Sequence, residues 1–125
     1  MQRHYETIAD TQRGPFTVIV DRSWEDLHPR DCFDDSVTDI QQLCEDIDSG
    51  KLEWFMLRVR VLFQDVELAS EYLGGCLYAD AREVMLDGTA EDIIYQALQQ
   101  AQVTAADMKK QFAALDENAV DNLYA

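Results

Sequence analysis

The clearest alternation of apolar and polar positions in the chain runs from residue 52 to residue 63. Every second side chain is apolar there, which is the period of a β-strand with one buried face. The predicted buried face carries Phe55, Leu57, Val59, Val61 and Phe63. The opposite face carries Trp54, Met56, Arg58, Arg60 and Leu62. The pattern predicts a strand with one face in the core, and it leaves open whether helices cover the other face too.

A second strand, from residue 66 to about residue 78, follows after the dipeptide Gln64-Asp65. A two-residue turn predicts a hairpin in which apolar side chains meet on one face and opposite charges on the other. The predicted pairs are Phe63–Val66, Val61–Leu68, Leu57–Tyr72 and Arg58–Glu71. Gln-Asp is not a favoured turn pair, so a longer loop is the alternative. Gly74-Gly75 interrupts the second strand and indicates a bulge or a close packing contact.

Apolar residues recur at helical spacing in two further segments. The first predicts a helix that Ser36 or Asp35 caps and that continues to about residue 48, with Ile40, Leu43, Cys44 and Ile47 on its buried face. The second predicts either one long helix or two helices with a break near Val103. Its stripe consists of Ile93, Ile94, Ala97, Leu98, Ala101, Met108, Phe112, Leu115 and Ala119. Thr89, with an acid three residues later, has the pattern of a capping box at the start of this segment.

The N-terminal third is less regular. Residues 16–20 are mostly β-branched and predict a short strand, whereas residues 1–13 carry no period and predict a loose tail. Residues 21–35 predict a loop with a short helical turn around residues 24–27. Together the elements predict one α+β domain over residues 1–125, with an antiparallel sheet of three or more strands and helices on one face. We expect one core that contains Phe55, Leu57, Val59, Val61, Leu68, Ile40, Leu43, Ile94 and Leu98.

Charge narrows the classes of partner. Among 125 residues there are 25 Asp and Glu against 10 Lys and Arg, which gives a net charge of -15. Such a surface repels nucleic acid and anionic membranes and attracts basic proteins. We therefore expect a basic protein partner, no direct binding to nucleic acid and no binding to membranes. Acidity that serves only solubility is the alternative.

The cysteines and histidines point away from catalysis. The thiols Cys32, Cys44 and Cys76 occur without a Cys-x-x-Cys pair, and no signal-peptide pattern opens the sequence, which favours the cytoplasm. Cys76 lies in a strand pattern, where a buried thiol is commoner than a nucleophile with its base. His28 and Cys32 lack the second ligand pair of a zinc site. We expect no enzymatic activity, no metal and no cofactor.

Acids are densest between Asp21 and Glu53, where there are eleven acids and three bases. Closely spaced carboxylates can imitate the phosphates of DNA, which carries one charge about every 1.7 Å of its axis. The predicted acidic binding residues are Asp31, Asp34, Asp35, Asp39, Glu45, Asp46 and Asp48. Aromatic residues beside arginines are typical of interfaces, so Trp54, Arg58 and Arg60 complete the predicted partner-binding set.

The segments Glu53–Arg60 and Leu73–Tyr78, with the size, acidity and α+β layout of the chain, resemble those of small acidic proteins from phages and mobile elements. That group blocks host defences and includes anti-CRISPR and anti-restriction DNA mimics. The resemblance transfers no residue role. It implies a non-enzymatic inhibitor that occupies a nucleic-acid-binding site on a host defence complex. The alternative is a structural or adaptor protein that forms a homodimer.

Overall fold

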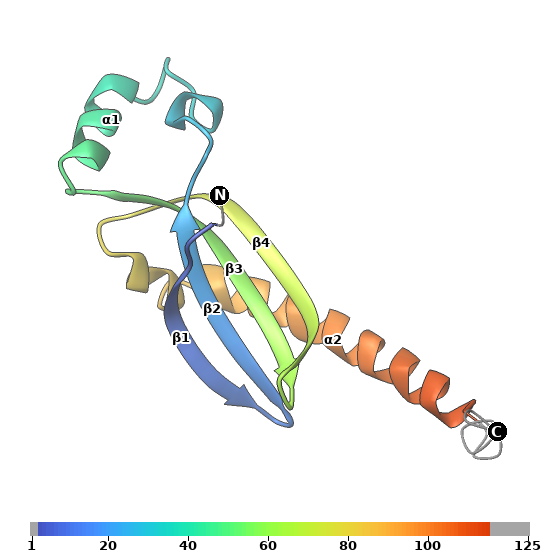
Figure 1. Ribbon diagram of the computed structural model, residues 1–125. Coiled ribbons are helices and arrows are strands. Elements are labelled where there is room, and N and C mark those ends of the chain that lie inside the picture. Colours follow the sequence, from blue (N-terminus) through green and yellow to red (C-terminus); the bar gives the residue numbers. More distant parts are fainter. Residues whose placement is uncertain (1–2, 116–125) are drawn as a thin grey trace.

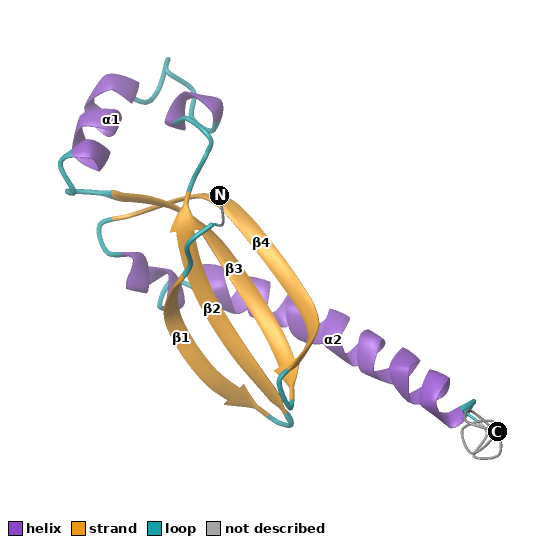
Figure 2. Ribbon diagram, in the orientation of Figure 1, coloured by secondary structure: helices purple, strands orange, loops and turns teal. Residues whose placement is uncertain are grey.

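The computed structural model describes residues 3–115 of the chain. Four strands form one antiparallel sheet in the order β1-β2-β3-β4, so each strand pairs with its neighbour in the sequence (Figure 1). The strands are β1 (Glu6–Arg13), β2 (Phe16–Trp24), β3 (Glu53–Phe63) and β4 (Val66–Tyr78). The long helix α2 (Thr89–Ala113) crosses one face of this sheet (Figure 2). The α+β prediction, with a helix on one face, is confirmed.

The core lies between α2 and the sheet. Helix α2 lies against β4 and β3, and its small buried residues Ala97 and Ala101 let it approach the strands closely. The fully buried strand residues of the same cluster are Val18, Val20, Leu57, Val59 and Val61. The predicted buried face of β3 is thus confirmed except at Phe63, which lies exposed beside the β3–β4 turn. Leu98 packs against this core while partly buried.

Residues 25–52 form a separate lobe, called the acidic lobe below, that projects from one end of the sheet (Figure 1). It contains the short 3-10 helix η1 (Pro29–Asp31) and the helix α1 (Ile40–Asp48). The prediction that Ile40 and Leu43 belong to the sheet core is wrong, because neither is part of the cluster under α2. The reason is topological: Trp24 pairs with Phe55, so the lobe leaves and re-enters the sheet at the same end.

The N-terminal predictions need two corrections. Residues 6–13 form the edge strand β1 rather than a loose tail, and they pair with β2 across the turn at Gly14-Pro15. A mostly polar edge strand lacks the alternation that reveals a strand with one buried face. In addition, β2 continues to Trp24 through the segment predicted as a loop, and the short helical turn lies at Pro29–Asp31 instead of residues 24–27.

The predicted β3–β4 hairpin is confirmed, with a different register. Both Gln64 and Asp65 adopt positive φ values, of 48° and 68°, as a tight two-residue turn requires. Phe63 pairs with Val66 next to the turn. A bulge between Val61 and Leu62 then shifts the pairs farther from the turn by one residue. Val61 therefore faces Ala69, Leu57 faces Leu73 and Arg58 faces Tyr72, in place of the predicted partners. A second bulge, opposite Phe55–Leu57, contains the Gly74-Gly75 pair, as predicted.

The helix boundaries are set by caps that the sequence patterns placed differently. Helix α2 runs unbroken through Val103, which resolves the choice between one helix and two. Its Thr89 side chain caps nothing; instead, the Thr89 amide donates to Asp87 at 3.0 Å. Asp39 caps α1, which begins at Ile40, later than predicted.

Ala119, assigned to the α2 stripe, lies outside the described residues. Within residues 3–115, no helix has the length and apolar character needed to cross a membrane.

Candidate binding surfaces

All seven predicted acidic binding residues lie in the acidic lobe, so the fold brings the sequence cluster together in space (Figure 1). Six of them are exposed and Asp46 is half-buried. Across residues 25–52 there are nine acids and only two bases, Arg30 and Lys51. The lobe is therefore a concentrated negative surface that stands apart from the sheet core.

Local hydrogen bonds orient several of these carboxylates. Asp39 accepts from the amide of Gln42 at 3.1 Å, and Asp34 accepts from the amide of Ser36 at 2.9 Å. The bond from the Ser36 amide lowers the pKa of Asp34 below its ordinary value. Asp31 accepts from the amide of His28 at 3.2 Å in a reciprocal cap of η1. These charges are held in place before any partner arrives, which reduces the entropy lost on binding.

The acidic lobe is attached to the sheet by Trp54, one of the predicted binding residues. The Trp54 Nε1 donates to the carbonyl oxygen of Leu27 at 2.9 Å, and its ring centroid lies 5.9 Å from that of Phe33. Glu25 adds a second link, because its carboxylate accepts from the amide of Gly75 on β4 at 2.7 Å. Trp54 is half-buried and connects β3 to the lobe through Leu27 and Phe33.

The other two predicted residues, Arg58 and Arg60, lie on the sheet face opposite α2 and share the carboxylate of Asp21. Asp21 Oδ2 accepts from Arg58 Nη2 at 2.7 Å and from Arg60 Nε at 3.2 Å. Its Oδ1 accepts from the Thr7 hydroxyl at 3.0 Å, and the Arg58 guanidinium lies 3.4 Å from the Tyr5 ring centroid. Asp21 is only 1% exposed. The two arginines are thus fixed parts of a charge cluster centred on a buried acid.

Sequence reasoning missed Asp21 because it assigned that residue to a loop. The available signal was the alternation of residues 19, 21 and 23, which lie across from the arginine-bearing face of β3. With one carboxylate between two guanidinium groups, this cluster carries a small positive excess in a strongly negative chain. Most of the electrostatic attraction of these three charges is to one another, within the sheet.

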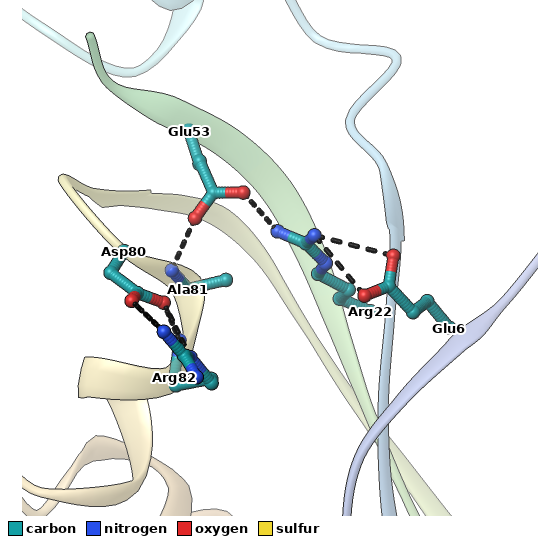
Figure 3. A network of polar contacts seen from close by, with 6 residues as sticks. All are labelled: Glu6, Arg22, Glu53, Asp80, Ala81 and Arg82. Atoms are coloured by element: carbon teal, nitrogen blue, oxygen red, sulfur yellow. Dashed lines mark hydrogen bonds and ion pairs between the residues drawn. The ribbon is translucent and has the colours of Figure 1, made fainter. Parts of the chain in front are cut away.

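A third polar cluster joins three strands to the 3-10 helix η2 (Ala81–Met85), as Figure 3 shows. Arg22 of β2 lies between Glu53 of β3 and Glu6 of β1, pairing with both. The second oxygen of Glu53 accepts from the amide of Ala81. The hydrogen bond with Glu53 raises the pKa of Arg22, so the guanidinium stays charged. This cluster fastens η2 to the sheet.

Asp80 and Arg82 stand beside this cluster, at the rim of a polar cavity of about 470 Å³ that Arg22 and Glu53 also line (Figure 3). Arg82 binds the Asp80 carboxylate at 2.6 Å and lowers its pKa to about 2. The cavity therefore presents carboxylates that are already paired with arginines. Such groups are poor proton donors or acceptors near neutral pH.

The thiols Cys76 and Cys44 lie in different surroundings. Cys76 is buried on β4, and this burial raises its pKa to about 11, which disfavours the nucleophilic thiolate. His28 lies nearest to Cys44, with 3.8 Å between Nε2 and Sγ, rather than acting with Cys76. Among residues 3–115, no three His, Cys, Asp or Glu side chains are grouped so as to hold a metal ion.

Comparison with known proteins gave no match: no protein-family model, no curated protein and no solved structure is similar to this chain. Its function must therefore be inferred from its own surfaces.

Proposed function

We propose that the protein is a non-enzymatic inhibitor that acts in the cytoplasm. It places its acidic lobe in a nucleic-acid-binding site on a host defence complex. An anti-CRISPR or anti-restriction factor of a phage or mobile element would act in this way. The observation that carries the proposal is the gathering of nine acids into residues 25–52, on a lobe that projects from the end of the sheet (Figure 1).

The charge of the lobe suits a site that normally binds phosphates. Nucleic-acid-binding sites are lined by lysine and arginine, and much of their affinity comes from neutralising a dense row of negative charges. Exposed carboxylates held by caps supply similar charges without the bases, so a basic groove accepts them regardless of its sequence preference. The field of the whole chain also speeds the encounter with a basic partner.

An exposed apolar side chain of the lobe offers a contact that charge alone does not provide. Val37 is 82% exposed, and it stands in the sequence between Asp35 and Asp39. A buried apolar anchor surrounded by polar groups is the usual arrangement of a specific interface. We infer that Val37 is covered in the complex and slows its dissociation.

The test uses three exposed lobe acids that do not cap the backbone in the structure. The variant Asp35→Asn, Glu45→Gln, Asp48→Asn removes three charges and keeps side-chain shape. A matched control, Asp10→Asn, Glu67→Gln, Asp107→Asn, removes three exposed charges outside the lobe. Each immobilised protein is incubated with nuclease-treated bacterial lysate, bound proteins are identified by mass spectrometry, and duplex DNA is then used to elute them.

We expect the wild type and the control to capture the same DNA-binding complex, and duplex DNA to release it. The lobe variant should associate about tenfold more slowly at low salt, and the difference should shrink near 0.5 M salt, where the Debye length is about 4 Å. Equal capture by the lobe variant and wild type would refute the proposal. So would a partner that duplex DNA does not displace.

A further inference from the structure

The apolar stripe of α2 continues beyond the part of the helix that the sheet covers. Ala101 is fully buried, and Ala105 and Met108 are half-buried. Phe112, in the last turn of α2, and Leu115, two residues after the helix ends, are 65% and 59% exposed. Spacings of four and three residues repeat along this stripe, as in the seam of two packed helices. The C-terminal part of α2 therefore presents an apolar seam to the surroundings.

The β3–β4 turn supplies a second apolar wall beside this seam. Phe63, Val66 and Leu68 lie across from Met108 and Phe112, and together they line a groove of about 380 Å³. Phe63 and Val66 are themselves 42% and 50% exposed. Open apolar side chains from two elements thus form one continuous patch, and such patches usually mark sites of association.

We propose that this groove binds the C-terminal half of α2 from a second copy of the chain, which gives a symmetric dimer. Phe112 on α2, Leu115 just after it and the two side chains beside the turn leave on the order of 300–400 Å² of apolar surface open in each copy. Two copies, with the stem of Lys109 at the rim of the groove, approach the roughly 1,000 Å² that a specific interface needs. A weak, reversible dimer is the expected result.

The distribution of charge favours a second copy at this place. Lys109 and Lys110, two of the three lysines in the chain, lie on this part of α2. The acidic lobe lies at the opposite end of the molecule (Figure 1). Asp65, Glu67 and Asp107 flank the groove too, but joining there keeps the two acidic lobes, the densest groups of acids among the described residues, away from each other. The dimer also carries two acidic lobes that point away from each other.

The test is the molar mass of the full chain in solution, measured by sedimentation equilibrium at about 0.3 M salt. Phe112→Glu places a charge in the seam, and Phe112 is exposed enough for the fold to tolerate it. Val103→Glu is the matched control, because Val103 is exposed on the same helix but lies off the stripe. Both variants change the net charge equally.

For the wild type and Val103→Glu, we expect the mass to rise from 14.3 kDa to about twice that value with increasing concentration, up to about 0.5 mM. Phe112→Glu should weaken association at least about tenfold. A wild type that stays monomeric overturns the proposal. If Phe112→Glu also lowers the melting temperature of that monomer, another part of the same chain occupies the groove. Equal loss of the dimer in Phe112→Glu and Val103→Glu also refutes the proposal. Partner capture by the lobe does not depend on Phe112, so failure here is distinct from failure of the proposed function.

Discussion

Asp21 and Arg58 face each other as direct partners in the pairing of β2 with β3, and the carboxylate of one accepts two hydrogen bonds from the guanidinium of the other. Because Asp21 is buried, a slip of one residue between these strands would turn its charge to the other face of the sheet, away from both arginines. The pair therefore specifies the register of β2 and β3 in addition to its electrostatic contribution.

Replacing Asp21 by asparagine should lower the free energy of unfolding by about 2–4 kcal/mol, because two arginines lose their shared counter-charge. Urea unfolding measures this loss. Asp10→Asn is the control, since Asp10 is exposed on β1 and its replacement should change stability by less than about 0.5 kcal/mol. A loss at Asp21 as small as the control's would show that the arginines are stable without it.

Truncation of the core should be costly in proportion to burial. Leu57 is fully buried under α2, so Leu57→Ala should cost about 2–4 kcal/mol through loss of contacts and the cavity left behind. Leu86 is 84% exposed, and the same substitution there should have almost no effect. Chemical unfolding of the two variants compares them directly. Similar costs at both positions would mean that the buried face of β3 is wrongly assigned.

The raised pKa of Cys76 makes a prediction about labelling and about pH. With a pKa of about 11, the thiol stays protonated at pH 8 and should resist a thiol reagent until the protein unfolds, whereas the exposed Cys32 reacts at once. Folding favours the protonated thiol. Its stabilising contribution is therefore complete below pH 9 and is lost as the pH rises towards 11.

Unfolding of wild type and Cys76→Ala at pH 8 and pH 10.5 measures this contribution, and the stability difference should shrink at the higher pH. Rapid labelling of Cys76 in the folded protein would contradict the buried position.

Trp54→Phe should loosen the acidic lobe while the sheet stays intact, because the substitution removes the hydrogen bond to the Leu27 carbonyl. Hydrogen exchange should quicken by about tenfold in α1 and remain unchanged in β3. Trp24→Phe is the control, since the Trp24 Nε1 donates to the Asp26 side chain two residues away and not to Leu27. Unchanged exchange in α1 would indicate that other contacts hold the lobe.

The elements predicted well from the sequence are those whose periodic side chains meet one buried surface. β3, β4 and α2 belong to this class, and their patterns needed no knowledge of distant partners. β1 was missed because an edge strand with polar faces has no such pattern. The second half of β2 was missed because Asp21 looks like a loop residue until Arg58, 37 positions later, is placed beside it.

The candidate surfaces were predicted in composition but not in arrangement. The acids from Asp31 to Asp48 were recognised by their density, and the fold gathers them into one lobe. Their separation from the core was not foreseen, because a helix with an apolar stripe was expected to pack on the sheet. Nor did the pattern show that Trp54 serves to hold the lobe, a role that depends on Leu27 and Phe33 folding back onto it.

The acidic lobe lies between Trp24 of β2 and Phe55 of β3, which are paired neighbours in the sheet. An insertion whose ends lie about 5 Å apart can be lengthened, shortened or exchanged with little change in the entropy of closing it. The sheet and α2 contain the core, so they do not depend on what the insertion contains. Evolution can therefore rewrite residues 25–52 for a new target while the scaffold keeps folding, and protein engineers can graft other binding segments at the same point.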